Sequence, residues 1–369
     1  MNEKVRGPHL SRRLFLGGAG ASFASAFAFP TPASVASDVT FFFISDVHAC
    51  RMKSGLSPHC QQEGKTDDSL LRHIAALNAL PGLQWPNQID GQPTGLPSFI
   101  IGPPRGIVLG GDMTDDGGGQ TTAPGEGTQL LQYSQRYVEG AGPDRVHFPV
   151  FQGLGNHDLD QDGPASQRDW YRNEMRDYVE ANHEPDPAFK PPFPAANYDA
   201  LSDAYSWDWD ELHLVQLHRF GGDTRKSATS ALPWLEANLA ANARDGRPVV
   251  IFQHYGWDHF SLERWDPSAV TFDDEGAGQA HWWSEDERQA LLSVLAGYNV
   301  VALFHGHEHP TPMIYEHNGL TLVKPKASFL GGFCVAQLAG GKLNIALGEA
   351  TDTPGIIKFT SALSKSIRS

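Results

Sequence analysis

The sequence is poor in cysteine and in basic residues, and its main part lacks a long apolar run. Three cysteines among 369 residues exclude a disulfide-dense scaffold. The 28 basic side chains are outnumbered by 43 acidic ones, and the resulting net charge of −15 argues against nucleic acid as a partner. After residue 40, no apolar run is long enough to span a bilayer. The rest is a globular composition, 40% hydrophobic and 19% charged, with enough apolar residues for a sizeable core.

The first 36 residues have the layout of an export signal. A basic stretch ends in Ser11-Arg12-Arg13-Leu14-Phe15-Leu16, an uncharged stretch follows to Phe29, and Ala33-Ser34-Val35-Ala36 resembles a cleavage site. The paired arginines resemble a twin-arginine signal, which is favoured over an ordinary secretory signal because the motif is specific and the apolar stretch is weakly hydrophobic. We therefore expect residues 1–36 to be a twin-arginine signal peptide and residues 37–369 to form one domain with long loop insertions. We expect the twin-arginine export machinery to be a partner of the chain. The mature protein would have no membrane span and would be periplasmic or secreted.

Apolar runs and helical spacing alternate along the mature chain. Short apolar runs predict buried strands at Thr40–Ser45, Gly106–Leu109, His147–Gln152, Leu212–Leu217, Pro248–Gln253, Asn299–His305, Leu320–Lys324, Phe333–Leu338 and Leu343–Leu347. Helical spacing predicts helices at Asp67–Leu80, Thr128–Glu139, Gln167–Ala181, Ala231–Ala243 and Ser284–Ala296, the last with a capping box of Ser284 and Glu287. Strands alternate with helices early, and hairpin-like pairs dominate late. This order favours an α/β (α+β) fold, a four-layer αββα sandwich of two mixed sheets flanked by helices.

Five short segments place metal-capable side chains directly after an apolar strand. These segments are Asp46-Val47-His48, Gly111-Asp112, Gly155-Asn156-His157-Asp158, His254 and Gly306-His307-Glu308-His309. Each of them alone is a weak signal, because a single such residue is usually a loop or surface side chain. Together they predict a pre-organised site at the ends of strands on a rigid sheet.

The ordered set Asp-x-His, Gly-Asp, Gly-Asn-His-Asp/Glu, His and Gly-His-x-His resembles the signature of the calcineurin-like metallophosphoesterases, and it extends from Asp46 to His309. The resemblance implies a dinuclear metal centre at the strand ends. In that centre the first metal would be bound by Asp46, His48 and His309, the second by Asn156, His254 and His307, and both by the bridging Asp112. Mixed imidazole, carboxylate and amide ligands suit iron, manganese or zinc better than magnesium or calcium.

The resemblance also implies a mechanism of hydrolysis. A hydroxide that bridges the two cations would attack phosphorus, and no covalent phosphoenzyme is required. His157, next to the ligand Asn156, would face the leaving group and either protonate it or stabilise its charge. Asp115 resembles the carboxylate that orients this imidazole. Asp158 is an alternative candidate for orienting His157. Asp115 would then be only a turn residue in its loop.

Other interpretations of the same residues conflict with the sequence. The segment His305–His309 contains His-x-x-Glu-His, a zinc-peptidase pattern that functions on a helix, but Gly306 and Pro310 oppose a helix there. Purple acid phosphatases resemble the pattern but carry a tyrosine three residues after the bridging aspartate, where this chain has Asp115. A non-catalytic binding protein of this type would have lost ligands, whereas this chain keeps every one.

The expected substrate is a small phosphate ester, with a phosphomonoesterase favoured. The alternative is a phosphodiesterase acting on a small diester, a phospholipid headgroup or a cyclic nucleotide. Arg51 is a candidate phosphate contact, or else a solvated loop residue. Tyr255 and Trp257 are candidates for the wall of the cleft, or else part of a small core beneath a tryptophan-rich loop. Cys50 and Cys60 are close enough in sequence to pair in an oxidising compartment, and two unpaired thiols remain the alternative.

Overall fold

The computed structural model describes residues 38–52, 55–56, 58–115, 128–159, 197–225, 228–262 and 282–367. The expected signal peptide at residues 1–36 and the expected helix at residues 167–181 lie outside these ranges, as does most of the tryptophan-rich loop. Within the ranges, no helix combines the length and the apolar character that crossing a membrane requires.

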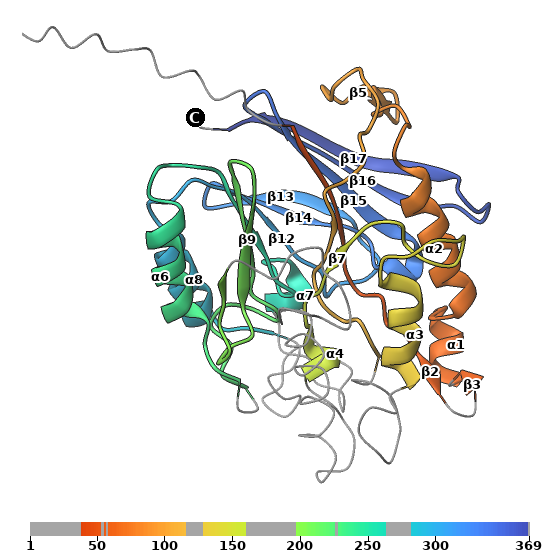
Figure 1. Cartoon of the computed structure of the whole chain (residues 1–369), viewed down its shortest axis with the longest axis horizontal. Helices are drawn as coiled ribbons and strands as arrows, with labels where there is room; N and C mark the ends of the chain where they lie inside the picture. The colour runs from red at the N-terminus through yellow and green to blue at the C-terminus, as the bar shows by residue number, and fades with distance from the viewer. Residues whose placement is uncertain are drawn as a thin grey trace, which may run out of the picture. The chain divides into compact units, whose positions relative to one another are not determined.

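Two large mixed sheets form the centre of the domain (Figure 1). The first has the order β17-β16-β15-β1-β6-β7. Its strands are β1 (Val39–Ile44), β6 (Ile107–Leu109), β7 (Val150–Phe151), β15 (Gly332–Ala339), β16 (Lys342–Ala350) and β17 (Ile357–Ser366). The central strand β1 runs parallel to β6 and antiparallel to β15.

The second sheet has the order β13-β14-β12-β11-β10-β9-β8. Its strands are β8 (Asn197–Tyr198), β9 (Tyr205–Trp209), β10 (Leu212–Gln216), β11 (Val249–Phe252), β12 (Val300–Phe304), β13 (Met313–His317) and β14 (Leu320–Lys324). Strands β10, β11, β12 and β14 run parallel. Two small hairpins accompany the sheets, formed by β2 (Arg51–Met52) with β3 (Gly55–Leu56) and by β4 (Gln88–Ile89) with β5 (Gln92–Pro93).

The sequence of β1 explains why this strand lies at the centre of the fold. Every residue from Val39 to Ile44 is buried, so neither face of the strand meets solvent. Phe41 and Phe43 pack between the two sheets, where the Phe41 ring lies 5.5 Å from that of Phe304 in β12. Phe42 and Ile44 point to the opposite face and contribute to the core under the helices. A continuous apolar run is what a strand buried on both faces requires.

Helices cover the outer faces of both sheets. The core of the first sheet includes residues of α2 (Asp67–Ala79) and α3 (Thr128–Tyr137), and that of the second includes residues of α6 (Leu232–Asn242) and α8 (Glu285–Leu295). Figure 1 shows these two helix pairs on opposite sides of the sheets. The remaining helices are short: α1 (Pro58–Glu63), α4 (Asn156–Leu159), α7 (His259–Leu262) and the 3₁₀ helix η3 (Ser328–Leu330). The αββα sandwich predicted from the sequence is confirmed.

Most predicted elements lie where the apolar runs place them. The capping box of Ser284 and Glu287 begins α8 as expected. The strand predicted at His147–Gln152 is shorter, because only Val150–Phe151 pairs with a neighbour. Strands β9, β13 and β17 were not predicted, although β17 is the longest strand of the first sheet.

Candidate metal centre

The candidate ligands lie in loops that follow parallel strands of the two sheets. Asp46 and His48 follow β1, Asp112 follows β6 and Asn156 follows β7; His254 follows β11, and His307 and His309 follow β12. Parallel strands carry their carboxyl ends to the same edge of a sheet, and loops at that edge form the usual binding sites of such folds. The order of the strands therefore gathers residues that are far apart in the sequence.

The backbone of these loops adopts conformations that few residues accept. Four candidate ligands have a positive φ: Asp46 (57°), His48 (47°), Asp112 (53°) and His307 (80°). A non-glycine residue in this region costs on the order of 1–3 kcal/mol, and such residues concentrate at functional sites. The surrounding hydrogen bonds hold these conformations, since the Asp46 N–H donates to the Gly111 carbonyl oxygen at 3.0 Å and the His48 N–H to that of Asp112 at 3.0 Å.

Two glycines of the signature are required by close backbone approach. A side-chain carbon on Gly155 would collide with the carboxylate of Asp112. A side-chain carbon on Gly306 would collide with the hydroxyl of Ser45 and with the Asp46 carboxylate. The glycines therefore allow the loops after β7 and β12 to approach the two aspartates.

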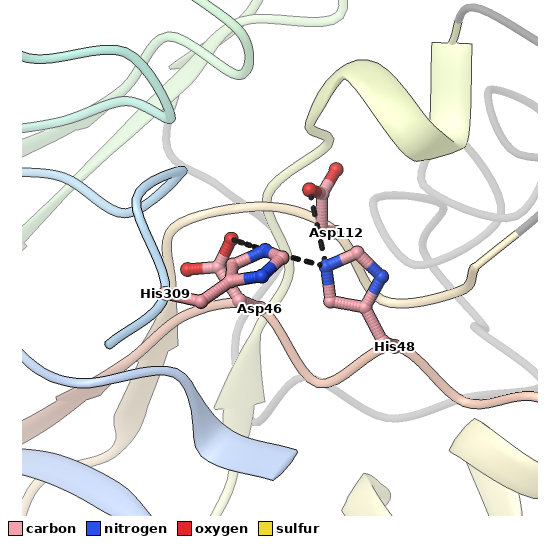
Figure 2. A group of neighbouring side chains, drawn as sticks. All are labelled: Asp46, His48, Asp112 and His309. Atoms are coloured by element: carbon pink, nitrogen blue, oxygen red, sulfur yellow. Dashed lines mark hydrogen bonds and ion pairs between the residues drawn. The ribbon is translucent and has the colours of Figure 1, made fainter. Parts of the chain in front are cut away.

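Four side chains form the first ligand group: Asp46, His48, Asp112 and His309 (Figure 2). The Nε2 atoms of the two imidazoles lie 3.1 Å apart. His48 Nε2 lies 3.5 Å from Asp112 Oδ2, and His309 Nε2 lies 3.6 Å from Asp46 Oδ1. Two ring nitrogens and two carboxylates thus converge on one buried point.

The second group shares Asp112 with the first and adds His254 and His307. His254 Nε2 lies 3.0 Å from Asp112 Oδ2, while the Nδ1–H of the same ring donates to the carbonyl oxygen of Gly110 at 3.1 Å. This second hydrogen bond leaves the lone pair on Nε2 when the ring is neutral, as a metal ligand requires. Asn156 is buried, and the backbone N–H of the next residue, His157, donates to Asp112 Oδ1 at 2.9 Å. The six other predicted ligands form the two groups, and Asn156 lies in the segment that meets the shared Asp112.

Asn156 Oδ1 is buried without a hydrogen-bond partner among the described residues, and a neutral His254 ring would leave Nε2 and Asp112 Oδ2 facing each other as two acceptors at 3.0 Å. Leaving a buried polar atom unpaired costs about 1–3 kcal/mol, so these atoms together indicate a ligand outside the protein chain. Each of them offers a lone pair when the ring is neutral, which a cation accepts. The residues therefore fit two cations with Asp112 between them, and the mixture of nitrogen and oxygen donors is typical of iron, manganese or zinc.

The charges of the second group are strongly coupled. Burial alone would raise the pKa of Asp112, but neighbouring histidines, His254 first, hold it well below its usual range. Burial would lower the pKa of His254, yet the carboxylate of Asp112 raises it to about 9. A cation that binds here must therefore displace a proton from His254.

His157 lies beside the first group, with its ring centre 4.7 Å from that of His48. Its Nδ1–H donates to the backbone carbonyl oxygen of Asp115 at 2.7 Å, which fixes the proton of the neutral ring on Nδ1. Burial works against the protonated ring, but Asp112 and Asp115 outweigh it and raise the pKa of His157. The protonated form is the one that donates a proton to a leaving group.

The structure corrects the role predicted for the Asp115 side chain. The backbone of Asp115 holds His157, whereas its carboxylate Oδ1 accepts the Nδ1–H of the ligand His48 at 2.9 Å. The same oxygen accepts from Lys65 Nζ at 2.6 Å. Asp115 therefore orients a metal ligand through its side chain and the candidate acid through its backbone.

Asp158, the alternative orienting group, does not contact the His157 ring in the described hydrogen bonds. Its carboxylate accepts backbone N–H groups of Met113 at 3.1 Å, Thr114 at 3.0 Å and Gly155 at 2.9 Å. Burial and the nearby Asp112 raise the pKa of Asp158 to about 6. Asp158 thus joins the loops after β6 and β7.

The candidate aromatic residues of the cleft are buried. The Tyr255 side chain is fully buried, and its ring lies 4.4 Å from that of the ligand His307. Trp257 is 7% exposed and packs against Trp283 with ring centres 4.8 Å apart. This is the small core that the sequence offered as the alternative. Both side chains pack into this core, while Tyr255 also lies against a candidate ligand, so their part in the wall of a cleft stays a prediction.

Arg51 contacts the two helices that cover the first sheet. One guanidinium nitrogen donates to Gln135 Oε1 of α3 at 3.2 Å, and another lies 3.5 Å from the carboxylate of Asp67 of α2. The half-exposed side chain therefore links these helices, and its contact with a phosphate stays a prediction.

Two residues near the ligands were missed in the sequence. Lys65 is 4% exposed and pairs with Asp115, which holds the pKa of Lys65 above its usual value although burial opposes this. Phe329 places its ring 5.5 Å from that of His48 and 5.1 Å from that of His309. Neither residue belongs to a recognisable motif, and only the folded chain brings them to the site.

The structure joins Cys50 and Cys60 in a disulfide, which resolves the alternatives left open by the sequence. Cys334 in β15 is a buried free cysteine. Cys50 follows the ligand His48 by two residues, so the disulfide fastens the first ligand loop to α1.

One protein family matches most of the chain. The model of the calcineurin-like phosphoesterase family matches residues 39–311. Among solved structures, the chain is similar to a dimetal phosphatase from Danio rerio, with 13% identity over 89% of this chain and 99% of that chain and a TM-score of 0.48. It is also similar to GAP50 of Plasmodium (11% identity, 90% of each chain, TM-score 0.48). A third similar structure is the purple acid phosphatase PPD1 of yellow lupin (13% identity, 90% of this chain and 54% of that chain, TM-score 0.49). A search among curated proteins finds no match.

Proposed function

The chain belongs to the calcineurin-like phosphoesterase family, and from this premise we propose that it hydrolyses phosphate monoesters at a centre of two cations. It is thus a metal-dependent phosphoester hydrolase. The observation that carries the proposal is the pair of ligand groups that share Asp112. When bound there, two cations would activate a water molecule and offset the negative charge of the phosphoryl group.

The chain's own residues supply the other parts of the reaction. His48 and His254 present Nε2 lone pairs because each donates its Nδ1–H to a fixed acceptor. His157 would donate its proton to the departing oxygen, since its raised pKa favours the protonated ring. After the transfer, the carbonyl oxygen of Asp115 would keep the neutral ring in place through Nδ1.

The preference for a monoester is supported by the positive charge around the site. A phosphate monoester carries a second negative charge that a diester lacks. Two cations and a protonated His157 together suit the more highly charged substrate. The competing proposal is hydrolysis of a small diester, a phospholipid headgroup or a cyclic nucleotide.

The proposal is tested by measuring the turnover of a monoester, p-nitrophenyl phosphate, and of a diester, bis(p-nitrophenyl) phosphate. The protein is first loaded with manganese, iron or zinc. We expect faster turnover of the monoester, with metal content and activity lost together in Asp112→Asn. Faster turnover of the diester would replace the monoesterase by the competing proposal. No turnover of either ester by the metal-loaded protein would contradict the proposed function itself.

We further propose that the protein is exported through the twin-arginine route and acts in the periplasm or outside the cell. The support is the pair Arg12 and Arg13 before a weakly apolar stretch. Replacing both arginines by lysine should retain the protein in the cytoplasm, as fractionation would show. Unchanged export of that variant would contradict the twin-arginine route.

A further inference from the structure

The carboxylate of Asp115 has three neighbours that together decide its position. Oδ1 accepts from His48 Nδ1 at 2.9 Å and from Lys65 Nζ at 2.6 Å. Oδ2 lies 3.4 Å from Cys60 Sγ. His48, Lys65, Cys60 and Asp115 are all buried, so each partner matters more than it would at the surface.

Lys65 is fixed in turn by the segment that contains the disulfide. Its backbone N–H donates to the carbonyl oxygen of Cys60 at 2.9 Å. The disulfide ties Cys60 to Cys50, and the N–H of Cys50 donates to Gln132 Oε1 of α3 at 2.9 Å. A continuous set of bonds therefore leads from the disulfide through Lys65 and Asp115 to the ligand His48.

The backbone of Asp115 is held by other partners. Its N–H donates to the Ala49 carbonyl oxygen at 3.1 Å and to Gln129 Oε1 at 3.0 Å, and its carbonyl oxygen accepts from His157. The carboxylate can therefore turn away from His48 while His157 keeps its place. The position of the His157 ring is therefore independent of the direction of the Asp115 carboxylate.

We propose that Lys65 is a positioning residue that holds Asp115 against His48, and that the Cys50–Cys60 disulfide makes this arrangement sensitive to dithiols. The inference rests on the proposed function, because it concerns the first metal position of the same centre. A dithiol reduces the disulfide and is itself oxidised to a disulfide. The bond between the two Sγ atoms breaks, and the dithiol's two hydrogens end on the Cys50 and Cys60 thiols.

Reduction alters the surroundings of Asp115 in two ways. The segment that carries Lys65 loses its covalent link to the loop of His48. The Cys60 thiol also gains an S–H, 3.4 Å from Asp115 Oδ2, and donation to that oxygen draws negative charge away from the Oδ1 that His48 bonds. Both changes weaken the orientation of His48, and loss of such an outer partner typically costs about 10–100-fold in metal affinity.

The first experiment compares Mn²⁺ binding by calorimetry in the wild type, Lys65→Met, Lys65→Arg and Lys326→Met. We expect Lys65→Met to bind one of two Mn²⁺ ions about 10–100-fold more weakly, with Lys65→Arg restoring part of the affinity. Lys326 is the matched control, because it is a nearby lysine that pairs with Glu349 and not with Asp115. Equal affinities in Lys65→Met and Lys326→Met would overturn the role of Lys65.

The second experiment treats the wild type with dithiothreitol, removes the reagent without air and repeats the titration. We expect the reduced protein to bind the first Mn²⁺ more weakly and reoxidation to restore the affinity. The double variant Cys50→Ser with Cys60→Ser should bind weakly with or without the reagent. Unchanged affinity in the reduced wild type would overturn the redox part of the inference. If the protein binds two Mn²⁺ ions but hydrolyses no ester, the proposed function is refuted. The Mn²⁺ affinities of the variants and of the reduced protein would still test the role of Lys65 and of the disulfide.

Discussion

At the scale of single residues, the site separates metal binding from proton transfer. Asp112 contributes to both ligand groups, whereas His157 belongs to neither and lies against His48. The hydrogen bond from His157 Nδ1 ends on a backbone oxygen, so the loss of this bond leaves the hydrogen bonds of the candidate ligand side chains in place. The two functions are therefore open to separate tests.

Replacement of His157 by alanine should leave the metal content unchanged and lower turnover about 10²–10⁴-fold, the usual contribution of a general acid. The loss should be larger for an alkyl phosphate than for p-nitrophenyl phosphate, because p-nitrophenolate departs with little need of a proton. Measuring kcat for both esters in the wild type and the variant checks this. Equal losses for the two leaving groups would contradict the role as proton donor.

The residue scale also shows where sequence reasoning ends. The ligands were predictable because each motif follows an apolar strand, and parallel strands bring such ends together. The partner of the Asp115 carboxylate was not predictable. The number of residues that separate Asp115 from His48 or from His157 does not indicate toward which of the two its side chain points. Lys65 had no signal at all, since an isolated lysine between two helices is usually solvated.

At the scale of helices and strands, burial decided what the sequence revealed. Strands β1, β11 and β12 are continuous apolar runs, and they are buried as such runs require. Strands β13 and β17 lie at sheet edges, and their residues are partly buried or exposed. Mixed polar and apolar residues at an edge resemble a loop when no partner strand is known. Tertiary pairing, and not local pattern, makes these segments strands.

An ion pair joins the two helices that cover the first sheet. Asp67 at the start of α2 accepts from Arg136 of α3 at 2.8 Å and 3.1 Å. Hydrogen bonds from Arg136 hold the pKa of Asp67 below its usual value, although burial opposes them. The ionised carboxylate is therefore stabilised by folding.

Asp67→Asn should lower the free energy of unfolding by about 1 kcal/mol at neutral pH, a modest value because the pair is partly exposed. A depressed pKa gives stability that is present above the unfolded value of about 3.9 and is lost as the pH falls through the folded value. The difference between wild type and variant should therefore shrink below about pH 4. Urea unfolding at several pH values measures it.

Asp68→Asn is the matched control for this variant. It removes the same charge from the first turn of α2 at an exposed position. The loss of stability at neutral pH should be smaller there, because the helix dipole acts on both residues while Arg136 contacts Asp67. An equal loss in both variants would show that the ion pair contributes nothing to stability.

At the scale of the whole molecule, the layered architecture was predictable and the walls of the site were not. Alternation of strands and helices was enough to predict two sheets between helices. The packing of Tyr255 and Trp257 depended on Phe220 and Trp283, which lie far from them in sequence or beyond a long loop. Aromatic residues serve a core and a cleft equally well, so their type alone does not distinguish the two.

Removal of metal should destabilise the whole domain, because ligands from both sheets meet at one centre. A cation at about 100 times its dissociation constant stabilises the folded state by about 2.7 kcal/mol. Adding a chelator to the metal-loaded protein should therefore lower Tm in a thermal scan. Asp112→Asn should show a smaller chelator effect, and a wild-type Tm that ignores the chelator would contradict metal binding at this centre.

The left-handed backbone at Asp46, His48 and Asp112 limits how this protein can be engineered for heat resistance. Glycine at each position would relieve about 1–2 kcal/mol of local strain, yet each replacement would also delete a candidate ligand. A library selected for thermal tolerance alone, and in the absence of metal, should accept such glycines and drift toward inactive proteins. Selection for turnover in the same library should keep all three residues and find its stabilising changes in the helices and the cores.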